Sequence, residues 1–175
     1  MYRRGIPLMP QEHLAYHLGL IVPKEDVHLF SKSRTGIKPS AGYGTQIEKK
    51  QFSPNTVFPK LGIPLVMTYH PAKELDEEDL INLLVEGEQK DKDFLICFDT
   101  GALGNSKKHG GHVCVFDSIN TKKKTIVLID PSSSQPKWRT VSIADLHRGM
   151  CYHWNKSGGI WEFRQKSKRL VTRKN

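Results

Sequence analysis

The spacing of hydrophobic residues predicts two amphipathic helices in the first half of the chain. Residues 10–19 begin with Pro, end with Gly, and place Leu14 and Leu18 on one face of a short helix. Residues 75–86 repeat Leu at helical spacing, and Gly87 is expected to end this second helix.

Further along the chain, apolar runs of strand length predict a sheet. Residues 93–99, DFLICFD, form one run, and residues 109–130 contain two more around a basic turn. A short helix with Ser142 as its N-cap follows. The other expected elements are a short helix from residue 53 that Pro59 limits, strands over 63–69 and 159–164, and loops over 19–52 and 101–111. Helices followed by mostly antiparallel strands indicate an α+β fold.

The segment HGGHVCVFDSINTKKKTIVLID, residues 109–130, has an ionisable residue near each end of an apolar hairpin. With residues 119–123 as a five-residue loop, His112 lies directly opposite Asp130. Cβ atoms of such pairs are about 4.5–5.5 Å apart, which allows an imidazole and a carboxylate to form a hydrogen bond. The other pairs on this face would be Cys114 with Leu128 and Phe116 with Ile126.

The His112–Asp130 pair has a catalytic and a structural interpretation. An Asp that fixes the tautomer of a His and raises its basicity is the orienter and base part of a nucleophilic triad. A purely structural contact at the edge of a sheet is the alternative. A change of one residue in loop length would place the two side chains on opposite faces, so the pair depends on the register.

The order of these residues resembles a known family. Gly-Gly-His at residues 110–112, an apolar hairpin and Asp-Pro at residues 130–131 resemble the His/Asp half of papain-fold cysteine peptidases, most closely the bacteriocin-processing, double-glycine leader peptidases. The stretch after Asp130 is also similar to phytochelatin synthases. The resemblance implies a single papain-like domain over residues 1–163, with a basic, flexible tail over 164–175. It further implies a peptide or protein substrate or ligand, with His112 as general base and Asp130 as its orienter.

The sequence departs from this family at the nucleophile. In the family a Gln and then a Cys precede the first helix, and here that position would lie about two or three helical turns before Met1. Gln11 and Gln46 have the wrong spacing for the oxyanion-stabilising Gln. Cys97 and Cys114 are expected in the core and Cys151 nearer the surface, and none opens a helix, the position that activates a thiol. We therefore expect little or no peptidase activity, either because the reading frame begins upstream or because the chain is a non-catalytic peptide-binding or protein-binding module.

Composition and charge bear on three further predictions: nucleic-acid binding, membrane insertion and cellular location. The chain has 175 residues and a formal net charge of +9, but its last twelve residues, RQKSKRLVTRKN, contain six Lys and Arg and no acid. Because aromatic residues do not interleave with these cations, nucleic-acid binding is not favoured. No run approaches the roughly 18 apolar residues of a membrane helix. Three cysteines without a CxxC motif do not form a disulfide framework, and a cytoplasmic location is the expectation.

A zinc site is a further alternative. The candidate soft or borderline ligands are His109, His112, Cys114, Asp130, Cys151 and His153. Their His-x-x-His-x-Cys spacing suits no standard structural zinc site, so no metal or cofactor is assigned. The other histidines, among them His13 and His17, are given no role. An apolar sheet face left uncovered by a missing N-terminal helix predicts dimerisation or aggregation.

Overall fold

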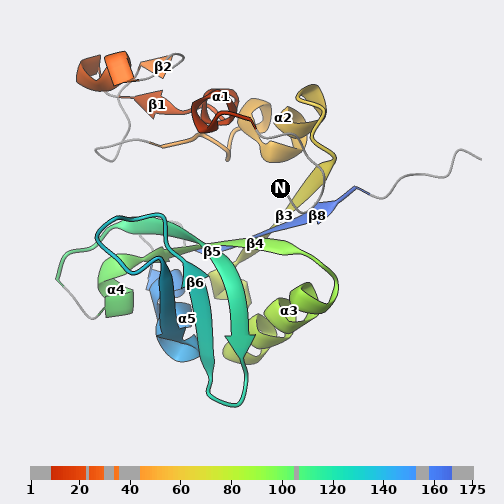
Figure 1. Cartoon of the computed structure of the whole chain (residues 1–175), viewed down its shortest axis with the longest axis vertical. Coiled ribbons are helices and arrows are strands. Elements are labelled where there is room, and N and C mark those ends of the chain that lie inside the picture. The colour runs from red at the N-terminus through yellow and green to blue at the C-terminus, as the bar shows by residue number, and fades with distance from the viewer. Residues whose placement is uncertain are drawn as a thin grey trace, which may run out of the picture. The chain divides into compact units, whose positions relative to one another are not determined.

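A computed structural model gives the architecture of the chain (Figure 1). It describes residues 9–22, 24–29, 34–35, 44–104, 107–152 and 158–166. The chain divides into two compact units, one comprising Met1–Val66 with Gln165–Asn175 and the other Met67–Arg164. Within these described residues, five α-helices and a six-stranded sheet confirm the α+β class.

The first unit is built from short elements. They are α1 (Gln11–His17), β1 (Ile21–Val22), η2 (Lys24–Leu29), β2 (Arg34–Thr35), η3 (Lys50–Phe52) and α2 (Pro54–Lys60). Helix α1 ends at His17, and Gly19 follows the end as expected; its φ of 75° strongly favours glycine, and its Cα faces the ring of Phe52. The expected loop over residues 19–52 thus carries short elements, including the parallel β1–β2 pair. Pro59 does not end α2, which continues to Lys60.

The second unit carries most of the sheet, whose first strand starts before the unit boundary. The elements are β3 (Leu65–Pro71), η4 (Ala72–Glu74), α3 (Glu77–Gln89), β4 (Asp93–Asp99), α4 (Thr100–Gly104), β5 (Gly111–Asn120), β6 (Thr125–Ile129), β7 (Trp138–Ser142), α5 (Ile143–Tyr152) and β8 (Gly159–Gln165). The strand order is β3-β8-β4-β5-β6-β7, and the neighbours from β8 to β7 are antiparallel. Strand β7 and helix α4 lie in segments for which the sequence predicted neither.

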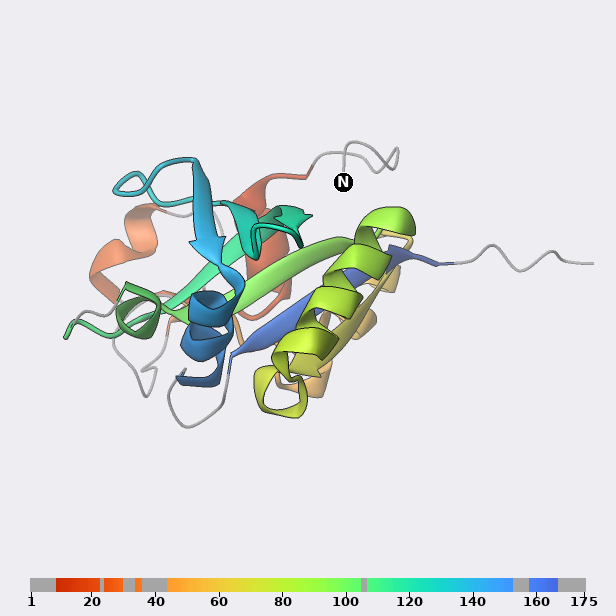
Figure 2. The same cartoon turned by 90° about the horizontal axis from the view of Figure 1, so that it is seen from below.

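The core of this unit follows from strand alternation. Phe94, Ile96 and Phe98 in β4 are fully buried, whereas the residues between them are half-buried on the other face. Helices α3 and α5 cover the Phe94 face, as Figure 2 shows. The other large, fully buried side chains of this core are Leu80, Leu84, Ile126, Leu128, Ile143, Leu146, Met150 and Ile160.

Helix α3 corrects one predicted boundary. The helix does not stop at Gly87 but runs to Gln89. Gly87 faces the ring of Phe94 so closely that a Cβ would lie 2.0 Å from a ring carbon. Close packing inside the helix therefore requires a glycine at this position. In the sequence, such a glycine cannot be distinguished from one that ends a helix.

The hairpin has a different register from the one predicted. Asn120 pairs with Thr125, so the loop is the four-residue segment 121–124. This register alone would place His112 and Asp130 on opposite faces of the sheet. A β-bulge at Asp117 shifts the pairing by one residue, so that Phe116 pairs with Leu128, and thereby restores the shared face.

The structure also bears on the predictions about membrane helices, a basic tail and a single domain. In the described ranges, no helix combines the length and apolar character needed to cross a membrane. Strand β8 continues to Gln165, and residues 167–175, most of the predicted basic tail, lie outside the described residues. The prediction of a single domain over residues 1–163 remains a prediction.

Candidate functional site

The structure brings the two predicted site residues together. His112 lies at the start of β5, and Asp130 follows directly after β6. Nε2 of His112 is 2.7 Å from Oδ1 of Asp130. Since an ionised carboxylate only accepts hydrogen bonds, Nε2 carries the proton and donates it to Asp130. Nδ1 is then the nitrogen with a lone pair that can accept a proton.

The Asp130 carboxylate is buried but incompletely satisfied. Its side chain is fully inaccessible to solvent, and Oδ1 also accepts a hydrogen bond of 2.9 Å from the backbone N–H of Ser132. Oδ2 has no hydrogen-bond partner among the described residues, and the nearest cation, Nη1 of Arg139, is 3.8 Å away. Burial acts to raise the pKa of Asp130, but the Ser132 amide and His112 outweigh it, so the pKa is lowered from its ordinary value. The group is therefore an anion at neutral pH.

His112 forms part of the wall of a polar cleft. Its side chain is 21% exposed, and its ring packs edge-on against Phe98, its neighbour across the β4–β5 pair. The cleft has a volume of about 380 Å³, and its other lining residues are Thr100, Gly104, Lys108, Ser132, Ser134, Gln135 and Arg139. Nδ1 of His112 makes no hydrogen bond within the described part of the chain. The cleft therefore lies beside a histidine whose tautomer is fixed by Asp130.

A second His–Asp pair lies at the same end of β4 and β5 and was missed in the sequence. Nδ1 of His109 is 2.8 Å from Oδ1 of Asp99, whose side chain is fully buried. Asp99 caps the start of α4, since it accepts the backbone N–H of Ala102 at 2.7 Å. It also accepts the N–H of Gly110 at 3.1 Å, so both oxygens are satisfied. Pairing residues 93–99 with 111–115 would have placed Asp99 near His109, because Asp99 lies opposite Gly111.

No cysteine of the chain is placed as a nucleophile. Burial raises the pKa of the Cys97 thiol to about 11. Burial, followed by the negative charge of Asp130, raises the pKa of Cys114 to about 12. Burial also raises the pKa of Cys151, which is half-buried in α5 with its thiol 3.6 Å from the carbonyl of Ala72. Cys114 lies in the core as expected, whereas Cys97 is half-buried on the opposite face of β4 from the Phe94 core.

Three of the candidate metal ligands converge. The ligand atoms of His112, Cys114 and Asp130 all lie within 4.8 Å of one another. His109 instead pairs with Asp99, Cys151 lies 3.6 Å from Nε2 of His147, and His153 is outside the described residues. A cation could therefore use one imidazole nitrogen, the sulfur of Cys114 and one carboxylate oxygen of Asp130.

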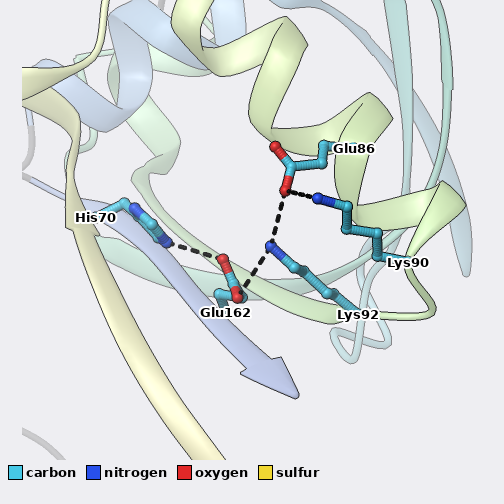
Figure 3. Close-up of polar contacts among 5 residues, drawn as sticks. All are labelled: His70, Glu86, Lys90, Lys92 and Glu162. Carbon is cyan, nitrogen blue, oxygen red and sulfur yellow. Dashed lines mark hydrogen bonds and ion pairs between the residues drawn. The ribbon is translucent and has the colours of Figure 1, made fainter.

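A buried carboxylate also lies between a histidine and a lysine elsewhere in the second unit, as Figure 3 shows. Oε2 of Glu162 is 3.1 Å from Nε2 of His70, and Oε1 is 3.2 Å from Nζ of Lys92. Lys92 and Lys90 both approach Oε1 of Glu86, at 3.5 and 2.8 Å. Alternation along β8 places Glu162 on the buried face of the strand, so the sequence could have predicted a buried carboxylate here. Since both of its oxygens have partners, the network links β3, β8 and the start of β4 and has a structural explanation.

Gln46 and Trp138 do not line the cleft. Gln46 donates its side-chain N–H to the carbonyl of Gly19 at 2.9 Å and accepts a hydrogen bond from Lys49, so it ties a loop in the first unit. Trp138 is 57% exposed on β7, with the ammonium of Lys137 4.7 Å from its ring centre.

Comparisons of the sequence with protein-family models and with curated proteins found no match. The case for function therefore depends on the chemistry of the residues.

Proposed function

We propose that residues 1–163 form a papain-like domain that binds a peptide or protein segment in the cleft beside His112. In this proposal His112 is the general base and Asp130 its orienter. The observation that carries it is the 2.7 Å hydrogen bond between Nε2 of His112 and the buried carboxylate, at the wall of a polar cleft.

The pair has the properties that proton transfer from a thiol requires. The lowered pKa of Asp130 keeps the carboxylate ionised, so it fixes the tautomer of His112 and stabilises the imidazolium that forms when Nδ1 takes a proton. A thiol presented to Nδ1 would lose its proton there and attack an acyl carbon as the thiolate. The order Gly-Gly-His, hairpin and Asp-Pro, which resembles the papain-type peptidases, supports the same assignment.

The nucleophile is the missing component. All three cysteines have raised thiol pKa values; Cys97 and Cys114 lie within strands, and Cys151 lies in the last turn of α5 rather than at a helix N-terminus. We therefore expect this chain by itself to bind peptides without cleaving them.

An external thiol tests the assignment without needing the natural substrate. With 2-mercaptoethanol and p-nitrophenyl acetate, the protein should accelerate formation of the thioester and p-nitrophenolate, with His112 accepting the thiol proton. In the His112→Ala variant, the protein-dependent rate of thioester formation should be at least tenfold lower, a factor expected for loss of a general base. Asp130→Asn should lose a similar factor because the tautomer is no longer fixed.

A matched control separates this effect from reaction at surface histidines. His28 is exposed, lies in the other unit and hydrogen-bonds only the carbonyl of Glu25 among the described residues. His28→Ala should retain the full rate. Equal rates in His112→Ala and the unmodified protein would refute the base assignment, and efficient peptide cleavage without added thiol would refute the missing nucleophile.

A zinc site at His112, Cys114 and Asp130 is a second candidate, favoured by the unpartnered Oδ2 of Asp130. A buried carboxylate oxygen without a partner is costly, and a cation would relieve that cost. Cobalt(II) substitution should then give a thiolate-to-cobalt charge-transfer band that Cys114→Ser removes and Cys97→Ser retains. Absence of the band in the unmodified protein would eliminate this candidate.

A further inference from the structure

Helix α1 in the first unit carries two histidines one helical turn apart. His13 and His17 are related by i,i+4 spacing, so both side chains project from one face of the helix. Both are partly buried, and their Nε2 atoms are 3.1 Å apart. The ring centroids are separated by 4.9 Å with an interplanar angle of 44°, so the two rings converge at their Nε2 edges.

From this geometry we propose that His13 and His17 chelate a borderline divalent cation such as Ni²⁺ or Zn²⁺. The site is in the first unit and does not depend on the function proposed for His112 and Asp130.

The distance between the two nitrogens fits a shared metal ion. Imidazole nitrogens bind zinc at about 2.0–2.1 Å, so two of them at a tetrahedral angle lie about 3.3–3.4 Å apart. The observed 3.1 Å therefore needs an opening of about 0.2–0.3 Å, well within the rotation available to partly exposed rings. Without metal, one Nε2–H donates to the other Nε2. The cation would replace this single proton and engage both lone pairs.

The spacing also limits the chemistry of the site. Two histidines at i,i+4 on one helix face are the arrangement by which the H-E-x-x-H motif holds zinc, with its Glu as general base. In this chain Leu14 occupies the position of that Glu. The site has the two nitrogen ligands but not the base, so it would bind the ion, with water in the remaining positions, and would not use it to hydrolyse peptides.

Nickel titration of the tag-free, chelator-stripped full chain tests the proposal. Isothermal calorimetry should detect one Ni²⁺ per chain, and His13→Gln or His17→Gln should each weaken binding at least tenfold because chelation is lost. Glutamine is a good helix former, so these variants should keep α1. His28→Gln removes an exposed histidine from the same unit, and Cys114→Ser disables the alternative site in the second unit. Both controls should bind Ni²⁺ as the unmodified protein does.

A measurement without substitutions gives a second readout. Ni²⁺ is paramagnetic, so it should broaden backbone amide NMR signals of residues 11–18 before those of other segments. No detectable Ni²⁺ binding, unchanged affinity in His17→Gln, loss of binding in Cys114→Ser, or broadening centred on β5 would each overturn the proposal. Failure of this site would leave the thiolysis test of His112 unaffected.

Discussion

The two His–Asp pairs at one end of β4 and β5 differ in how completely the carboxylate is satisfied. Asp99 accepts two backbone N–H groups and His109, with partners on both oxygens. Asp130 accepts one backbone N–H and His112 on a single oxygen, and Oδ2 has no hydrogen-bond partner among the described residues. The ring of His109 stacks on Tyr152, with centroids 4.8 Å apart, whereas His112 lines the cleft.

This difference separates a His–Asp pair whose carboxylate is fully hydrogen-bonded from a His–Asp pair whose carboxylate is not. A fully satisfied buried carboxylate fixes local structure, here the start of α4 and the approach to β5. A buried carboxylate with an oxygen that accepts no hydrogen bond is costly for stability. When it lies next to a histidine that lines a cleft, it is a candidate for function. Four predictions test this contrast, beginning with the largest expected effect.

Asp99→Ala should reduce the free energy of unfolding by about 3 kcal/mol, because it leaves two backbone N–H groups and His109 without their buried acceptor. Chemical denaturation monitored by circular dichroism measures the change. Asp145→Ala removes a half-exposed ion pair with Arg148 and should cost no more than about 0.5 kcal/mol. Equal losses in the two variants would contradict a structural role for Asp99.

His109→Ala and His112→Ala should separate stability from chemistry. Each removes one hydrogen bond to a buried carboxylate, so each should cost about 1.5 kcal/mol of stability. In the thiolysis assay, however, only His112→Ala should lose at least tenfold in rate, whereas His109→Ala should stay within twofold. If both variants lost the same rate, the two pairs would not have different roles.

Both pairs should contribute to stability in a pH-dependent way. The pKa values of Asp99 and Asp130 are lowered in the folded protein, so their contribution is present above the unfolded value of about 3.9 and is lost as the pH falls through the lower folded value. Unfolding measured from pH 7 to pH 2 should therefore show a decline that begins near pH 4. Asp99→Asn and Asp130→Asn should each have a shallower decline than the unmodified protein, and parallel curves would contradict the linkage.

The smallest expected effect concerns Cys114. Asp130→Asn removes a negative charge that raises the pKa of this thiol, but burial remains the larger cause. Alkylation by iodoacetamide, followed by mass spectrometry, should therefore become a few-fold faster at Cys114. Cys97 should not change, because burial alone raises its pKa. An equal increase at both thiols would indicate general loosening of the fold.

The fold class and most elements could be predicted because they depend on local patterns. The alternating burial in β4 and the helical spacing in α1 and α3 are visible in the residues themselves. Ser142 could be recognised as a cap, and its hydroxyl accepts the backbone N–H of Asp145 at 3.0 Å. The predicted end of α3 was wrong because Gly87 is a glycine for a reason that the local sequence does not show. It makes room for the ring of Phe94, which packs against the helix.

The candidate site was predicted through a register that is wrong in detail. Both the loop length and the bulge at Asp117 differ from the prediction, and together they return His112 and Asp130 to one face. No sequence rule places that bulge, because it depends on how β5 and β6 pair along their whole length. The Asp99–His109 pair was missed for a similar reason, since it requires the pairing of β4 with β5.

The sequence by itself determined which residues alternate, which cap helices and which histidines share a helix face, because these properties need only the neighbours along the chain. The tertiary structure alone decided which of the two carboxylates would be fully satisfied, because its partners come from strands and loops distant in sequence. That difference, between a fully hydrogen-bonded Asp99 and an Asp130 whose Oδ2 has only the Arg139 guanidinium 3.8 Å away, is the basis for proposing a function for one pair and a structural role for the other.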